Sequence, residues 1–180
     1  YILLEFVSGG SLKSLLRKFK RFDEPIARNY IRQILDGLIY LHENGIIHRD
    51  VKSANMLVSP DGVVKLTDFG SSKKYTIADA DFGMTMSMRG SPYWMAPEVV
   101  NRSGHSYSAD IWSLGCLLIE LLTGAPPWSN YTNRSDAVMK LIGLDGKLPD
   151  FPTNCSPDCK SFIKNCLVRD AFSRPSALSL

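Results

Sequence analysis

Two carboxylates, an ammonium group and an amide form the pattern in this sequence that is best suited to chemistry. Asp50, Lys52 and Asn55 lie in one short segment, and Asp68 follows it downstream. Each of these residues, taken alone, favours an ordinary surface pairing, because acids commonly lie near bases. Together, the carboxylate and amide oxygens are ligands that Mg²⁺ prefers, with phosphate oxygens completing its coordination. A carboxylate that orients an attacking hydroxyl beside a metal-bound phosphate is what phosphoryl transfer requires.

A β hairpin is expected to bring these residues together. Short apolar segments over residues 56–58 and 63–66 are joined by the turn Pro60-Asp61-Gly62. Since the hairpin starts after Asn55 and ends before Asp68, it should place their side chains side by side.

Most of the remaining chain has helical periodicity. Ser11 is suited to cap one helix, and Ser108 is expected to cap another that is apolar on almost all sides and therefore buried. Residues 67–93 have no period, and so long a stretch is usually a functional or mobile loop. The expected helices cover residues 12–19, 25–44, 111–122, 135–142 and 157–167, and a strand is expected over 1–6. The sequence therefore predicts a mainly α (α+β) fold, a helical bundle with one small β hairpin.

The composition excludes several kinds of partner. The chain has 180 residues, of which 44% are hydrophobic and 22% charged, with a net charge of +3. Because charges of both signs are mixed throughout, no nucleic acid or membrane partner is expected. The cysteines lack metal-binding spacing, which favours reduced thiols in a cytoplasmic protein over a disulfide or zinc framework. They are Cys116, Cys155, Cys159 and Cys166.

Three motifs resemble, in the same order, the signature set of the eukaryotic protein kinases. They are the segment at 48–55, Asp68-Phe69-Gly70, and Met95-Ala96-Pro97-Glu98. The resemblance covers essentially the whole chain and implies the helical C-lobe of a protein kinase. Residues 1–7 would be the last strand of the N-lobe and the hinge, and 8–180 the C-lobe. Residues 48–55 would be the catalytic loop and 68–98 the activation segment.

The same resemblance implies ATP and Mg²⁺ as cofactors and assigns roles to the residues that match. Asp50 would accept the proton of the substrate hydroxyl, and Lys52 would neutralise charge on the transferred phosphoryl group. Asn55 and Asp68 would bind Mg²⁺. The nucleotide would be bound by Glu5, Val7, Ser11 and Leu57, with Leu4 at the gatekeeper position.

Other matching residues would hold the structure in shape. Glu98 would pair with Arg174 near the end of the chain as a structural latch. Asp110 would tie down the backbone of the catalytic loop, although an acid at the start of a helix is an equally compatible interpretation. Ser91 should keep its hydroxyl near Asp50 and Lys52.

Arg49 resembles an arginine that binds a phosphate on the activation segment, where phosphate adds charge that guanidinium pairs with. Thr85 and Ser87 lie where that phosphate is expected, which implies an upstream activating kinase. The alternative is a loop that is rich in hydroxyls only because it is solvated.

The segments at 90–99, 167–170 and 174–177 resemble the MAP kinase kinase kinase branch, whose members are serine/threonine-specific. The resemblance therefore implies a protein substrate such as a MAP kinase kinase.

No glycine-rich phosphate loop and no N-lobe lysine or glutamate match the family pattern, so a truncated chain with little activity of its own is expected. A pseudokinase-like scaffold or binding module is the main alternative to an enzyme. A small-molecule kinase fits the loop chemistry, but it does not explain the segment at 90–98.

Overall fold

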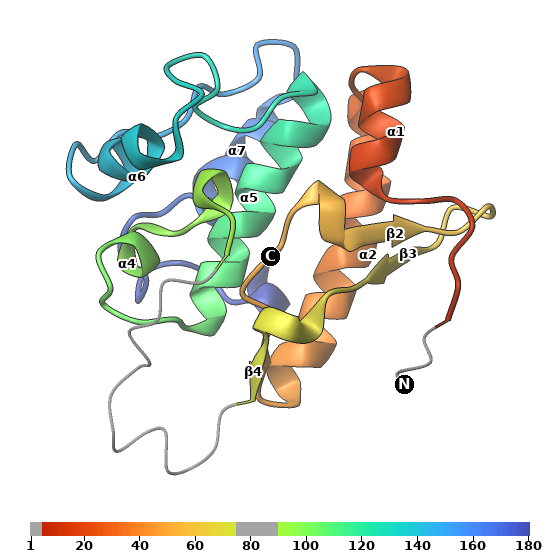
Figure 1. Ribbon diagram of the computed structural model, residues 1–180, viewed down its shortest axis with the longest axis horizontal. Coiled ribbons are helices and arrows are strands. Elements are labelled where there is room, and N and C mark those ends of the chain that lie inside the picture. Colours follow the sequence, from red (N-terminus) through yellow and green to blue (C-terminus); the bar gives the residue numbers. More distant parts are fainter. Residues whose placement is uncertain (1–4, 75–89) are drawn as a thin grey trace.

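The computed structural model describes residues 5–74 and 90–180, which form a mainly helical body with two small sheets (Figure 1). Helix α5 runs through the middle of the body, and α2 and α7 pack against it. The principal helices are α1 (Leu12–Phe19), α2 (Glu24–Glu43), α4 (Pro97–Val100), α5 (Tyr107–Thr123), α6 (Ser135–Gly143) and α7 (Pro157–Cys166). The predicted mainly α fold is confirmed. Within the described residues, no helix is long and apolar enough to cross a membrane.

Helix α5 is the centre of the hydrophobic core because apolar side chains occupy nearly every side of it. Trp112, Leu114, Leu117 and Leu121 are fully buried. The helix ends at Gly124, where φ is 80° and an added Cβ would lie 1.9 Å from the carbonyl oxygen of Lys20. A glycine is needed there, since the end of α5 touches the backbone of the α1–α2 turn directly.

The predicted hairpin is confirmed. Strand β2 (Met56–Val58) pairs antiparallel with β3 (Val64–Leu66), in a register that places Met56 opposite Leu66. Gln33 of α2 fixes the turn, because its side chain accepts a hydrogen bond from Val64 N at 2.9 Å and donates one to Gly62 O at 3.2 Å. The hairpin therefore lies against α2, and its open end points toward the loops that carry Asn55 and Asp68 (Figure 1).

Within 67–93, the described residues 67–74 and 90–93 contain more regular structure than the sequence predicts. Strand β4 (Lys73–Lys74) pairs antiparallel with β1 (Ile46–Ile47). Short 3₁₀ helices form at Phe69–Ser71 and Pro92–Trp94. These pieces are too short to produce a period, so sequence periodicity could not reveal them.

The structure differs from the sequence prediction at the start of α5 and at the expected strand over 1–6. The prediction that Ser108 caps α5 is wrong, because the helix begins at Tyr107, directly after Ser106, and Ser108 lies within its first turn. The Ser108 side chain instead bonds the Ser106 hydroxyl at 2.6 Å, and its carbonyl accepts from Arg174. Of the expected strand over 1–6, residues 1–4 lie outside the described residues, and residues 5–6 form no strand.

Candidate active site

Three side chains converge on the carboxylate of Asp50, which is only 8% exposed. Lys52 Nζ donates to Oδ2 at 2.6 Å, and the Ser91 hydroxyl donates to Oδ1 at 3.0 Å. Asn55 Nδ2 donates to Oδ2 and to the Asp50 carbonyl, both at 2.9 Å. Lys52 also donates to Ser91 Oγ at 2.6 Å. Both carboxylate oxygens are therefore fixed by charged or hydroxyl donors, which leaves the group little freedom to rotate.

The backbone before Asp50 is held by Asp110, near the start of α5. Asp110 accepts hydrogen bonds from His48 N at 2.9 Å and Arg49 N at 2.8 Å, and its Oδ2 lies 3.0 Å from His42 Nε2. Arg49 has a φ of 68°, which is unfavourable for a residue with a side chain. The buried carboxylate therefore stabilises an unusual backbone turn that aims Asp50 at its partners. The first turn of a helix also favours a negative charge.

His48 connects the loop that carries Asp50 to the segment that carries Asp68. Its Nε2 lies 3.1 Å from the carbonyl oxygen of Thr67, and its ring centroid lies 5.4 Å from that of Phe69. The pairing of β1 with β4 reinforces this connection on either side. The two loops are thus held together by both side-chain and backbone contacts.

Asn55 and Asp68 lie at the same end of the hairpin, but different partners hold their side chains. Thr67 donates to the Asn55 carbonyl from its N–H at 3.0 Å and from its hydroxyl at 3.1 Å. The amide nitrogen of Asn55 donates to Asp50, so the side-chain oxygen Oδ1 is the atom left to bind a hydrogen-bond donor or a metal ion. The Asp68 side chain is exposed, on a residue with a φ of 63°.

This donor set fits Mg²⁺. An amide oxygen and a carboxylate are hard oxygen ligands, and Mg²⁺ usually takes only one or two protein carboxylates together with water and phosphate. Among the residues that the structure describes, no group of three or more His, Cys, Asp or Glu side chains could hold a metal ion by itself. The few protein ligands suit an ion that is bound jointly with phosphates.

The residues assigned to the nucleotide follow the edge of the hairpin. Leu57 is half-buried on β2, and Ser11 forms an isolated β bridge with it. The Ser11 hydroxyl also accepts from Ser14 N at 3.2 Å, so the predicted cap of α1 is present. Val7 is half-buried, whereas Glu5 is exposed and forms an ion pair with Lys65. Leu4 lies outside the described residues.

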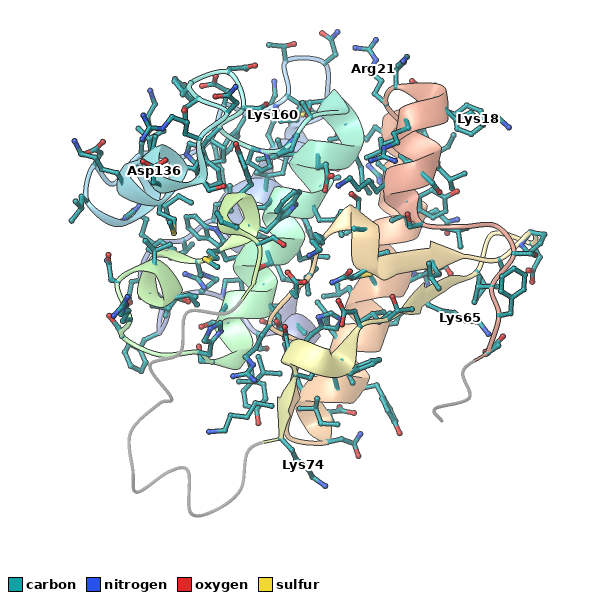
Figure 2. The ribbon with its side chains drawn as sticks, viewed as in Figure 1. Lys18, Arg21, Lys65, Lys74, Asp136 and Lys160 are labelled. Carbon is teal, nitrogen blue, oxygen red and sulfur yellow. The ribbon has the colours of Figure 1, made fainter. Side chains whose placement is uncertain are left out.

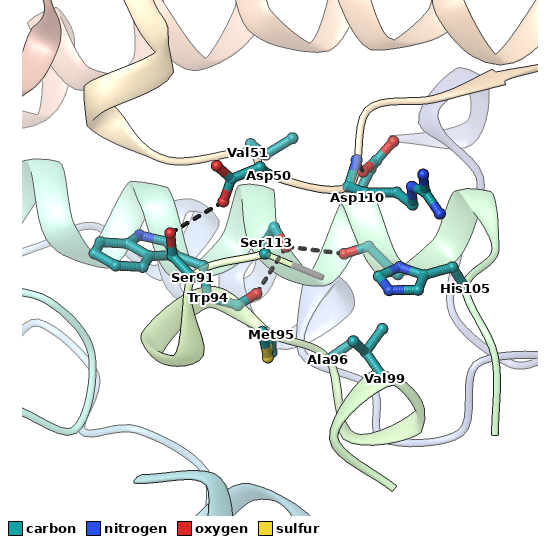
Figure 3. Close-up of a pocket in the computed structure, with 13 residues that line it drawn as sticks. Asp50, Val51, Ser91, Trp94, Met95, Ala96, Val99, His105, Asp110 and Ser113 are labelled. Atoms are coloured by element: carbon teal, nitrogen blue, oxygen red, sulfur yellow. Dashed lines mark hydrogen bonds between the residues drawn. The ribbon is translucent and has the colours of Figure 1, made fainter. Parts of the chain in front are cut away.

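A small cavity lies beneath the loop of Asp50, between that loop and α5 (Figure 3). Figure 3 shows Ser91 directed at Asp50 from the opposite wall. Ser113 of α5 donates to the carbonyl oxygens of Trp94, at 2.7 Å, and Ala109, at 3.1 Å. The segment after Ser91 is therefore attached to the same helix that positions the loop of Asp50.

Sequence reasoning missed Glu120, which joins the loop of Ser53 to the segment of Trp94. This α5 residue is 4% exposed, and its carboxylate accepts from Ser53 Oγ at 2.5 Å and from Trp94 Nε1 at 3.1 Å. Burial raises the pKa of Glu120, and the hydrogen bonds from Ser53 and Trp94 oppose that rise. The signal in the sequence was a single acid inside an otherwise apolar run, since buried acids are rare without partners.

Glu98 and Arg174 form the predicted pair in a buried setting. Arg174 donates to the two carboxylate oxygens of Glu98 at 2.8 and 3.1 Å. It also donates to the carbonyl oxygens of Val168, at 2.8 Å, and Ser108, at 2.6 Å. The Arg174 side chain is 0% exposed. The arginine therefore joins the end of the chain to α4 and α5.

Arg49 is occupied by backbone carbonyls within the described residues. Its guanidinium donates to the carbonyl oxygen of Ser71 and, at 3.2 Å, to that of Ser72. Thr85 and Ser87 lie outside the described residues, so the predicted phosphate contact stays a prediction.

All four cysteines are free thiols. Burial raises the pKa of Cys159 and of Cys166 to about 12, and it raises that of Cys116 as well. Thiols of this kind are poor nucleophiles at neutral pH.

Comparison with known proteins shows which family the chain belongs to. The model of the protein kinase domain family matches residues 1–180. The chain is 50% identical to mitogen-activated protein kinase kinase kinase 3 of Arabidopsis thaliana, over 99% of this chain and 27% of that protein. It is 47% identical to mitogen-activated protein kinase kinase kinase A of Dictyostelium discoideum, over 99% of this chain and 19% of that protein. It is 43% identical to mitogen-activated protein kinase kinase kinase 19 of Mus musculus, over 99% of this chain and 14% of that protein.

The chain therefore spans 27% or less of the length of these relatives. The resemblance deduced from the sequence motifs is confirmed: the chain belongs to the protein kinase domain family.

Proposed function

We propose that the chain is the C-lobe of a serine/threonine protein kinase, which transfers the γ-phosphoryl group of ATP to hydroxyl groups of a protein substrate. In this proposal, residues 1–7 end the N-lobe and form the hinge, and residues 8–180 form the C-lobe. The catalytic loop is 48–55 and the activation segment is 68–98. The observation that carries the proposal is the buried carboxylate of Asp50, held by Lys52 and already accepting a hydrogen bond from an alcohol, that of Ser91.

Asp50 and Lys52 have different roles in the proposed reaction. Asp50 Oδ1 accepts from the Ser91 hydroxyl at 3.0 Å, so a substrate hydroxyl brought to the same carboxylate would find an acceptor for its proton. Lys52, 2.6 Å from the other oxygen, would offset negative charge on the transferred phosphoryl group. Removal of the proton makes the substrate oxygen a better nucleophile toward phosphorus.

Asn55 and Asp68 would hold Mg²⁺, and Glu5, Val7, Ser11 and Leu57 would contact the nucleotide. When bound, the metal ion neutralises charge on the phosphates of ATP. The location of Ser11 and Leu57 on one side of the hairpin, with Asn55 and Asp68 at its end, supports a nucleotide that lies along β2.

The names of the relatives support a place in a signalling cascade. We infer that the substrate is a MAP kinase kinase, and that the protein acts in the cytoplasm. An upstream kinase would phosphorylate Thr85 or Ser87, and Arg49 would bind the new phosphate. If alanine at both positions leaves activity unchanged, this part of the proposal is wrong. The chain alone should transfer little phosphate, because an N-lobe would supply half of the nucleotide cleft.

The proposal is tested by phosphoryl transfer from radiolabelled ATP in the presence of Mg²⁺, with the full-length protein and its Asp50→Asn variant. We expect the variant to lose at least about a thousand-fold in kcat while it keeps its fold, because asparagine cannot accept the proton. Equal, background-level transfer by both proteins would instead support the pseudokinase-like scaffold. Transfer to small alcohols without transfer to protein would support a small-molecule kinase.

A further inference from the structure

A groove between α1 and α2 has apolar walls that remain open on the described surface. Leu15 and Phe19 line it from α1, and Ile26 and Tyr30 line it from α2, over the ring of Phe22. Phe19 is 56% exposed and Ile26 is 47% exposed, whereas Phe22 is only 7% exposed. The groove is therefore a recess with an aromatic floor, and its apolar walls are of the kind that mark an interaction surface.

The periodicity of the two helices explains why this surface exists. Leu12 and Leu16 fill the core side of α1, and Phe19, three positions after Leu16, extends the apolar stripe beyond the core. Ile26 and Tyr30, four positions apart, face the same groove from α2. Each helix thus carries more apolar surface than the core covers.

Positive charge is concentrated around this groove. Residues 12–23 contain five basic side chains and one acid, Asp23, although the whole chain has a net charge of only +3. None of the five forms an ion pair with any described residue: they are Lys13, Arg17, Lys18, Lys20 and Arg21. Arg21 lines the groove, and Lys18 Nζ lies 5.4 Å from the centroid of the Phe19 ring. Figure 2 shows Lys18 and Arg21 extending from the end of α1.

We propose that this groove docks an acidic, amphipathic helical segment of a partner protein. Apolar side chains of the partner at helical spacing enter between Phe19 and Ile26, as in other helix-in-groove complexes. Asp and Glu side chains on either side of them pair with the basic residues of 17–21, which accelerates association and makes it sensitive to salt. A protein segment fits better than a lipid surface, because a flat surface would reach the protruding Phe19 but not the recessed floor at Phe22. The proposal goes beyond phosphoryl transfer and does not depend on it.

The test is a titration of the full-length protein with fluorescent peptides of about 16 residues, a length of about four helical turns. The probe has Leu or Phe at helical spacing and Glu at the other positions. Its controls are a scrambled peptide and a peptide with Lys in place of every Glu. The protein variants are Phe19→Ala with Ile26→Ala, which removes the apolar walls, and Lys18→Glu with Arg21→Glu, which reverses surface charge. The matched control is Phe172→Ala with Leu144→Ala, since these residues are 91% and 78% exposed and lie outside the groove.

We expect each groove variant to weaken binding of the acidic probe at least about ten-fold, and the matched control to change it less than about two-fold. Binding should weaken with added salt for the wild type, and much less for the charge-reversal variant. Phosphoryl transfer to a short peptide, measured on the same samples, reports separately on the proposed function and on correct folding.

Three results would overturn the docking proposal. One is unchanged binding in both groove variants, or no binding of the acidic probe to the wild type. The second is equal binding of the acidic and basic probes. The third is recruitment to phosphatidylserine vesicles that Lys18→Glu with Arg21→Glu abolishes while the acidic peptide does not compete, which would identify a membrane surface. Because the charge-reversal variant changes only exposed side chains, it remains informative if the apolar variant misfolds.

Discussion

Ser91 and Asp50, 41 positions apart in the chain, are joined by a hydrogen bond of 3.0 Å from the serine hydroxyl to Oδ1 of the carboxylate. Lys52 Nζ lies 2.6 Å from an oxygen of each, so the three polar groups form a closed triangle. The segment that begins at Ser91 is therefore attached directly to the group proposed to accept the substrate proton. Its position and the orientation of Asp50 depend on each other.

Removal of the Ser91 hydroxyl should reduce activity without loss of the fold. We expect Ser91→Ala to lower kcat roughly ten- to hundred-fold, because Asp50 and Lys52 each lose a partner that fixes them. Ser91→Thr keeps the hydroxyl and should stay within about three-fold of the wild type. Steady-state kinetics of the full-length protein measure both variants. Equal losses in Ser91→Ala and Ser91→Thr would show that the hydroxyl has no such role.

Substitution of Asp110 should destabilise the loop that carries Asp50. Asp110→Ala leaves the buried N–H group of His48 and the partly buried one of Arg49 without their acceptor, at a cost of about 1–3 kcal/mol for each group. We therefore expect a loss of about 2–6 kcal/mol in the free energy of unfolding, measured by urea denaturation. Asp36→Ala, at an exposed position on α2, is the control and should change stability by less than about 0.5 kcal/mol. A similar small change in Asp110→Ala would contradict this role.

Removal of one partner of the Glu98–Arg174 ion pair should destabilise the fold strongly, as expected for a buried pair. Arg174→Ala is expected to cost about 3–5 kcal/mol of unfolding free energy, because it leaves the Glu98 carboxylate poorly compensated. It should cost more than Glu98→Ala, since Arg174 also binds the carbonyls of Val168 and Ser108.

Denaturation of the two single variants and the double variant gives the coupling energy of the pair. Arg134→Ala breaks the exposed pair with Asp136 and is the control, for which a change of less than about 1 kcal/mol is expected. Exact additivity of Glu98→Ala and Arg174→Ala would mean that the two residues stabilise the fold independently.

Glu120 should make stability depend on pH. Burial raises its pKa above the ordinary value of 4.5, so between the two pKa values the folded protein holds a proton that the unfolded chain has released. Its contribution to stability is therefore complete below pH 4.5 and is lost as the pH rises through the folded-state pKa.

The Glu120→Gln variant has no carboxyl group to titrate. Its free energy of unfolding should therefore fall less steeply as the pH rises from 4.5 through the folded-state pKa of Glu120. Urea denaturation at a series of pH values measures the difference. Glu43→Gln, at an exposed position on α2, is the control and should keep the slope of the wild type. A slope in Glu120→Gln equal to that of the wild type would show that Glu120 does not titrate in this range.

Much of the fold was predictable because it depends on local patterns. The helical period and Pro25 placed α2, and the turn at 60–62 between two apolar segments placed the hairpin. The short pieces within 67–93 escaped prediction because a strand of two residues or a single 3₁₀ turn has no detectable period. The helix start at Tyr107 was missed because no side chain caps it, so the first turn of α5 carries no local capping signal.

The sequence by itself determined which residue types were available for chemistry and in which order: Asp50, Lys52, Asn55 and Asp68 are recognisable because they lie in motifs that resemble those of the protein kinases. Only the tertiary structure decided that Asn55 gives its amide nitrogen to Asp50, and that Glu120 links Ser53 to Trp94. The physical reason is that hydrogen bonds between residues 67 and 26 positions apart depend on how helices and loops pack, which no local pattern records. The basic, apolar groove between α1 and α2 likewise exists only because two helices meet there.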